Sequence, residues 1–230
     1  MVFLAELKNA LILIGSFDPE LMQIIGLSLK VSGLAVLIAG LFSVPLGTLL
    51  GLCPPRRVRW LTKIIYTLMG LPPVVAGLVI YLLLSSSGPF GVLELLWTPS
   101  AMVIAQTVLA IPIITGLTMM GIRQKGKEVL ETAVTLGANQ WQTAWTILVE
   151  ARYAITGAFV TGFGRVVAEV GAVMMVGGNI EGYTRVMTTA IVLETRQGNF
   201  ELAISLGIVL LFIAFVFNSL LHFLQEEKSQ

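Results

Sequence analysis

Five long apolar runs separated by short polar segments make up most of this chain. They cover residues 20–52, 64–84, 99–122, 151–178 and 200–224. At 1.5 Å of rise per helical residue, each run can cross a hydrocarbon layer of about 30 Å. The pattern therefore predicts an all-α integral membrane protein with about five transmembrane helices. Pro45 is expected to kink the first span, and Pro72-Pro73 to lie inside the second.

The polar interruptions predict the remaining organisation. Residues 2–15 are too short to span a bilayer and contain Glu6 and Lys8, which predicts an interfacial helix. The expected division is an N-terminal interfacial segment at 1–19, a transmembrane domain at 20–224 and a charged tail at 225–230. A short surface helix is predicted at Gly91–Trp97.

The distribution of basic residues predicts the orientation. The loop at 53–63, the segment at 123–152 and the tail carry most of them, whereas Lys8, Arg185 and Arg196 fall on the other side. We therefore expect a multi-pass membrane protein with a defined orientation. Its N-terminus is expected outside, and residues 123–152 and the C-terminus in the cytoplasm.

Composition changes this picture little. Charged residues make up 12% of the chain and hydrophobic residues 56%, whereas a soluble domain is about one quarter charged. A net charge of +1 without a basic patch gives no reason to expect nucleic acid. One cysteine and one histidine exclude a disulfide framework and leave little for a redox or metal centre. A membrane enzyme and a channel remain alternatives, although a channel leaves residues 123–152 unexplained.

Residues 123–152 predict two helices around a turn, Glu128–Leu136 and Gln140–Glu150. Gly137 can adopt the left-handed conformation after a helix, and Asn139 can cap the next one. Trp141 and Trp145 share a face of the second helix, which indicates contact with a partner protein. The preceding Gly121–Lys127 has the spacing of a phosphate-binding loop. However, Glu128 replaces its Ser or Thr and a span precedes it, so no nucleotide site is expected.

The motif Glu131-Thr132-Ala133, with three residues between it and Gly137 and nine more between Gly137 and Ile147, resembles the EAA loop of binding-protein-dependent ABC transporter permeases. Thr132 and Val149-Glu150 depart from the usual motif. The resemblance implies a MetI-like bundle whose two cytoplasmic helices couple to an ATPase. It implies a transport permease of a prokaryotic inner membrane rather than an enzyme, with no cofactor on this chain. The expected partners are a second copy in a homodimer, an ATPase dimer that holds ATP and magnesium, an extracytoplasmic substrate-binding protein and membrane lipid. The implied coupling residues are Glu131, Ala133, Gly137, Trp141, Trp145 and Ile147.

The stretches Gly164–Ile180 and Thr184–Thr195 are similar to tungstate permeases, with molybdate permeases sharing less of the pattern and sulfate more distant. The resemblance implies import of an oxyanion, most simply tungstate, with molybdate as the alternative. Arg165 and Glu169 stand four residues apart and can pair. Such a pair either holds the bundle together or lines the translocation path.

The segment after the fourth span carries Asn179, Thr184, Arg185, Thr188 and Thr189, which are expected at the outer mouth. Hydroxyl donors beside a positive charge would suit a tetrahedral oxyanion. Contact with the binding protein, or simple capping of the loop, is the favoured alternative.

Overall fold

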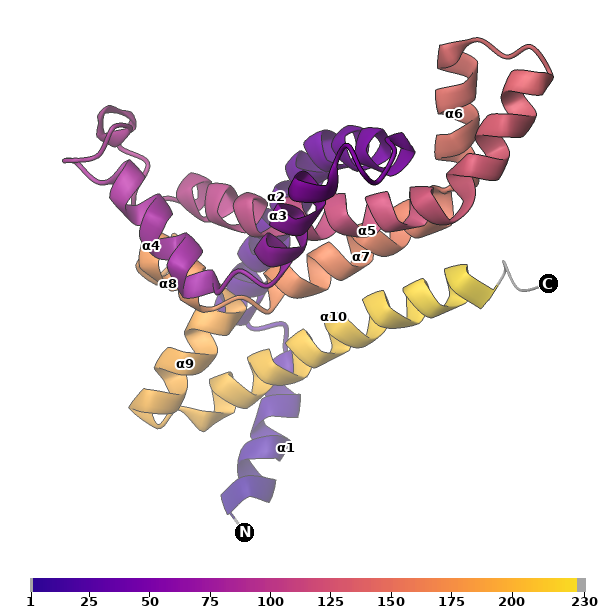
Figure 1. Ribbon diagram of the computed structural model, residues 1–230. Coiled ribbons are helices and arrows are strands. Elements are labelled where there is room, and N and C mark those ends of the chain that lie inside the picture. The colour runs from indigo at the N-terminus through magenta and orange to yellow at the C-terminus, as the bar shows by residue number, and fades with distance from the viewer. Residues whose placement is uncertain (1, 227–230) are drawn as a thin grey trace. The chain divides into compact units, whose positions relative to one another are not determined.

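The computed structural model describes residues 2–226, with side chains for 6–220 except 125, 127 and 140. The predicted all-α fold is confirmed, and no strand occurs in this described part (Figure 1). Residues 227–230 of the predicted tail lie outside it. The elements are α1 (Val2–Gly15), α2 (Pro19–Leu52), α3 (Arg59–Met69), α4 (Pro73–Leu84), the 3-10 turn η1 (Gly91–Leu93), α5 (Pro99–Thr135), α6 (Gln140–Glu150), α7 (Arg152–Val167), α8 (Gly171–Gly177), α9 (Met187–Gln197) and α10 (Phe200–Glu226).

Three helices in the described part are long and apolar enough to cross a membrane alone: α2, α5 over Pro99–Gln124 and α10 over Phe200–Leu220. Two further pairs, α3 with α4 and α7 with α8, reach this length only if each bent pair counts as one span. The predicted number of about five spans therefore holds with two of them broken. Pro45 lies inside α2, which continues past it without interruption.

The second predicted span is not one helix. The run breaks at Gly70–Pro72, between the end of α3 and the start of α4. Pro72 is extended, with φ −62° and ψ 124°, because the ring of Pro73 disfavours helical geometry in the residue before it. Pro73 then occupies the first position of α4, where its missing N–H costs nothing. Both prolines therefore lie inside the second predicted run, as expected, but they divide it into two helices.

The fourth predicted span, 151–178, is also broken, because α7 ends at Val167 and α8 begins at Gly171. Helix α8 lies against α4, and small residues allow the approach (Figure 1). A Cβ on Gly77 would lie 2.7 Å from the Ala172 Cα, and one on Gly171 would lie 2.7 Å from the Val74 Cγ2. Helix α8 ends at Gly178, whose φ of +70° is the left-handed conformation that glycine adopts readily after a helix.

The polar segment at 123–152 also differs from expectation at its start. Helix α5 continues without a break to Thr135, so the predicted helix Glu128–Leu136 is the last part of the third span's helix. Residues 123–128 contain no proline and mostly good helix formers, so their polarity ends the apolar run without ending the helix. Helix α6 has the predicted bounds. The predicted surface helix at Gly91–Trp97 is only the short turn η1.

The described chain forms two compact units. The first contains residues 2–35, 72–106 and 164–217, and the second contains residues 36–71, 107–163 and 218–226. In the first, α1 is held to α10 by the Ser205 hydroxyl, which donates to the carbonyl of the buried Ala10. In the second, α2 approaches α5 closely, and a Cβ on Gly47 or Gly51 would clash with Thr118 or Ile122.

Candidate functional site

A helical hairpin in the second unit is formed by the last turns of α5 and by α6 (Figure 1). Gly137 turns the chain with φ +80°, which is the left-handed conformation predicted for it. Asn139 caps α6 in a reciprocal arrangement: its Oδ1 accepts from the Gln142 N–H, and the Gln142 Oε1 accepts from the Asn139 N–H, both at 2.9 Å. Turn and cap are local, and both form as the sequence predicted.

The interior of this hairpin is apolar. Ile147 is 1% exposed and lies in a cluster with Ile122 and Ala151, and Ala133 is also buried. Two of the six predicted coupling residues, Ala133 and Ile147, are therefore inside the hairpin. There they hold α6 against α5, since buried side chains stabilise through contact area.

The outer surface of the hairpin carries large apolar side chains. Trp141 is 86% exposed, Trp145 is 69% exposed and Leu136 is 81% exposed, while Glu131 is also exposed. The same hairpin has a groove of about 390 Å³, and Leu136 forms part of its lining. Its lining comes from both helices and includes two acidic residues: Glu128, Val129, Thr132, Ala133, Leu136, Ala138, Thr146 and Glu150. Large exposed side chains such as these tryptophans are typical of a protein-binding surface.

Replacing Gly137 with alanine is expected to loosen this hairpin. A Cβ would meet nothing within 4 Å, so the cost comes from the left-handed backbone alone and amounts to about 1 kcal/mol. Protease sensitivity of the 136–139 turn and the thermal midpoint of the purified protein measure the effect. Gly137→Asn is the matched control, because asparagine tolerates this conformation better. Wild-type behaviour of both variants would show that the turn does not depend on glycine.

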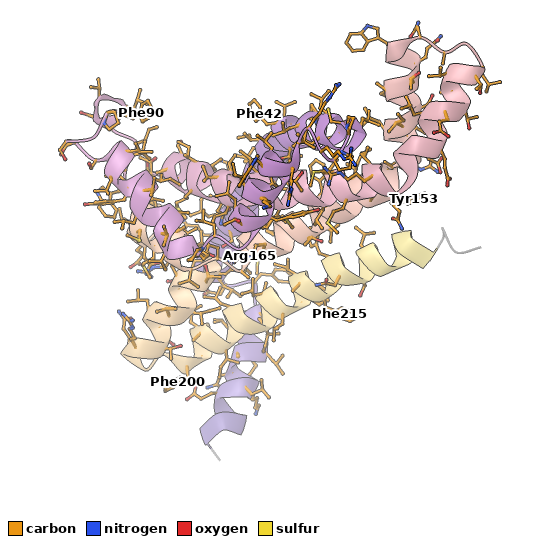
Figure 2. All side chains as sticks on the ribbon, viewed as in Figure 1. Phe42, Phe90, Tyr153, Arg165, Phe200 and Phe215 are labelled. Atoms are coloured by element: carbon orange, nitrogen blue, oxygen red, sulfur yellow. The ribbon has the colours of Figure 1, made fainter. Side chains whose placement is uncertain are left out.

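Arg165, which is labelled in Figure 2, forms the predicted ion pair with Glu169, with 3.1 Å between Nη1 and Oε2. The Arg165 side chain is 42% exposed, whereas that of Glu169 is 5% exposed. Glu169 lies in the break between α7 and α8, where its Oε1 accepts the Ala172 N–H at 3.2 Å. Its backbone carbonyl accepts the Thr188 hydroxyl at 2.8 Å. One residue thus joins the end of α7, the start of α8 and the start of α9.

The three threonines predicted at the outer mouth are buried. The Thr184 hydroxyl donates to the Gly177 carbonyl and accepts the Ile180 N–H, and the Thr189 hydroxyl accepts the Val186 N–H. With Thr188 bonded to Glu169, all three hydroxyls brace the chain's own backbone. Asn179 is half-buried with φ +54°, and its Oδ1 has no partner.

Arg185 lies among carboxylates. Its guanidinium is within 3.6 Å of Glu20, 3.4 Å of Glu181 and 3.7 Å of Glu194, and its side chain is 11% exposed. Three carboxylates around one guanidinium give this cluster a net negative charge, which disfavours the binding of a free oxyanion there. A groove of about 510 Å³ borders this cluster, lined by the first turns of α2 and by residues 181–185.

Among the side chains that the structure describes, within residues 6–220, no cluster of three or more histidine, cysteine or acidic residues could hold a metal ion. Two features of the site were not predicted from the sequence. One is the break that makes Glu169 a helix cap, for which Gly171 was the available signal. The other is Arg123, which was counted only as a positive charge although it directly follows an apolar run.

Together, the helical fold and the spans define a multi-pass α-helical membrane protein, and its α5–α6 hairpin exposes tryptophans. Residues 43–227 match the family described as "Binding-protein-dependent transport system inner membrane component", and the chain belongs to this family. It is a transport permease rather than an enzyme.

Individual relatives and one solved structure are more specific than the family match. It is 43% identical to the tungstate uptake system permease protein TupB of Peptoclostridium acidaminophilum, over 99% of this chain and 100% of the relative. It is 36% identical to the TupB of Campylobacter jejuni, over 95% and 92%. Sulfate and molybdenum transport permeases match at lower identity, for example 29% and 28%. A chain of the MetNI methionine ABC transporter in an inward-facing conformation has the same fold, with a TM-score of 0.69 over 89% of this chain and 96% of that one at 15% identity.

Proposed function

We propose that this chain is the permease subunit of an ABC importer for tungstate. The observation that carries the proposal is the end-to-end similarity to tungstate uptake permeases, which leaves only about 1% of this chain unmatched. The translocation path would lie between two copies of the chain in a homodimer of an inner membrane. Molybdate is the second candidate, because molybdenum permeases are also related and the two anions have the same charge and shape.

The α5–α6 hairpin is proposed to seat on a separate ATPase dimer, which binds ATP and magnesium. Trp141, Trp145 and Glu131 would make the contact, while Ala133 and Ile147 keep the hairpin rigid enough to transmit movement. A rigid hairpin is required because a loose one would absorb the displacement of the ATPase instead of passing it to α5. The basic loops support a cytoplasmic location for this hairpin, with the N-terminus outside.

An extracytoplasmic binding protein is proposed to deliver the anion at the surface formed by Glu20, Glu181 and Arg185. The net acidic character of that surface fits basic side chains of the binding protein better than it fits the anion itself. The half-exposed Arg165 is the candidate cation on the path. When no anion is bound, Arg165 pairs with the Glu169 carboxylate.

Uptake into cells tests the proposal. Cells lacking their own tungstate and molybdate importers would express this chain with its cognate ATPase and binding protein, and intracellular tungsten and molybdenum would be measured by mass spectrometry. We expect tungsten accumulation that needs all three components. Calorimetry of the binding protein with each anion shows where selectivity lies. If this complete system accumulates molybdenum but no tungsten, tungstate import is wrong; accumulation without the ATPase would overturn the importer itself.

A further inference from the structure

Arg123 carries a positive charge that no described carboxylate pairs with. Its side chain is half-buried, and its Nη2 donates to the Thr62 hydroxyl at 3.1 Å and to the Leu50 carbonyl at 3.4 Å. Its Nε is buried and has no partner, and no carboxylate in the described part of the chain pairs with it. A guanidinium held partly out of water without a counter-charge is unfavourable, so an anion at this position would be stabilised.

A cavity of about 460 Å³ lies beside Arg123 in the second unit. Apart from that arginine its walls are uncharged, and they come from the end of α2, the loop after it and α5: Gly51, Leu52, Cys53, Pro54, Pro55, Ile122 and Leu130. Both helices reach the limit of their candidate spans here, at Leu52 and Gln124. The cavity thus combines one cation with apolar walls at the border expected between hydrocarbon and water.

The neighbouring loop and α3 have the character of a membrane interface. Arg56, Arg57, Arg59 and Lys63 are exposed, and none pairs with a carboxylate of the described residues. Trp60 is 75% exposed, with the Lys63 Nζ 4.7 Å from its ring centroid. The same helix also exposes leucine and isoleucine side chains. Basic residues, an exposed tryptophan and apolar side chains together are typical of segments that lie among lipid headgroups.

We infer that this cavity binds the phosphate headgroup of an anionic phospholipid, with Arg123 as its counter-charge. The guanidinium still has unused N–H donors, and arginine binds phosphate oxygens through several donors at once. The uncharged walls favour a lipid over a free oxyanion, because they can contact the first carbons of an acyl chain. The basic residues of the neighbouring loop and α3 add longer-range attraction to an anionic leaflet.

Lipid retention by the purified full-length protein tests the inference. The protein would be exposed to equal amounts of phosphatidylglycerol and phosphatidylcholine in detergent, and bound lipid would be counted by native mass spectrometry. We expect wild-type protein to retain phosphatidylglycerol preferentially. Arg123→Gln should weaken this retention about fivefold or more, the effect of one basic residue near an anionic lipid surface. Arg196→Gln removes an exposed arginine from α9 and should leave retention unchanged.

One further variant and one competition measurement complete the test. Arg123→Lys retains the charge with fewer donors, so it should keep most of the preference even if the glutamine variant folds poorly. Inorganic phosphate and tungstate at millimolar concentration should not displace the lipid; if they do, the cavity is a soluble-anion site. Equal retention of both lipids by the wild type, or equal losses in Arg123→Gln and Arg196→Gln, would overturn the lipid site. None of these outcomes depends on which anion the protein imports.

Discussion

Replacing Glu169 with alanine is expected to abolish import and to lower the thermal midpoint of the purified protein. The substitution removes the ion pair with Arg165 and the acceptor for the Ala172 N–H at the start of α8. Hydrogen bonds to charged groups contribute about 1.5–3 kcal/mol each, and partial exposure of Arg165 lowers the share of the ion pair. We therefore expect the free energy of unfolding to fall by about 2–3 kcal/mol, which corresponds to about 5–10 °C for a chain of this size.

Two matched variants separate the roles of this carboxylate. Glu169→Gln keeps an oxygen that can accept the Ala172 N–H but removes the charge, so its midpoint should lie between those of the wild type and the alanine variant. Arg165→Gln should destabilise least, because the arginine side chain is 42% exposed. If Arg165→Gln folds normally but blocks import, the arginine serves the path. Wild-type import and midpoint in Glu169→Ala would contradict both roles.

Replacing Trp141 and Trp145 together with alanine is expected to detach the permease from its ATPase without unfolding it. Both side chains are mostly exposed, at 86% and 69%, so the cost to folding should stay within about 0.5 kcal/mol for each. Buried tryptophans at interface centres cost about 2 kcal/mol or more when truncated, which weakens binding about 30-fold. Co-purification of the ATPase and ATP-driven import measure the loss.

Trp60→Ala is the matched control for this experiment, because Trp60 is equally exposed but lies on α3, away from the α5–α6 hairpin in the sequence. It should leave association with the ATPase unchanged. If the double variant co-purifies and imports as the wild type does, the tryptophan surface has a different purpose. If Trp60→Ala loses the ATPase as well, the coupling surface is larger than the hairpin.

The features predicted well from the sequence depend on neighbouring residues. Gly137 turns the chain because glycine alone carries no penalty at positive φ, and Asn139 caps α6 through a residue only three positions away. The apolar runs follow from the length needed to cross a bilayer. The break before Pro73 had a local signal as well, since a residue before proline disfavours helix, but the prolines were placed inside the span instead.

Other features depend on partners distant in the chain. Arg185 meets Glu20, which comes from the start of α2, so the charge balance around it follows only from the fold. Thr188 appeared as an available donor, yet its hydroxyl bonds to the carbonyl of Glu169, 19 residues earlier. Arg123 appeared as one of several basic residues, yet its lack of a counter-charge is known only once every carboxylate around it has a position.

The sequence by itself determined the membrane class, the five apolar runs, the turn and cap of the α5–α6 hairpin and the pairing of Arg165 with Glu169. Each of these is set by hydrophobic length or by residues within one helical turn. Only the tertiary structure decided that two runs break, that Glu169 caps α8, and that the threonine hydroxyls face inward. The physical reason is that a polar group's partner, and the space left for a side chain, come from segments that the fold alone brings together.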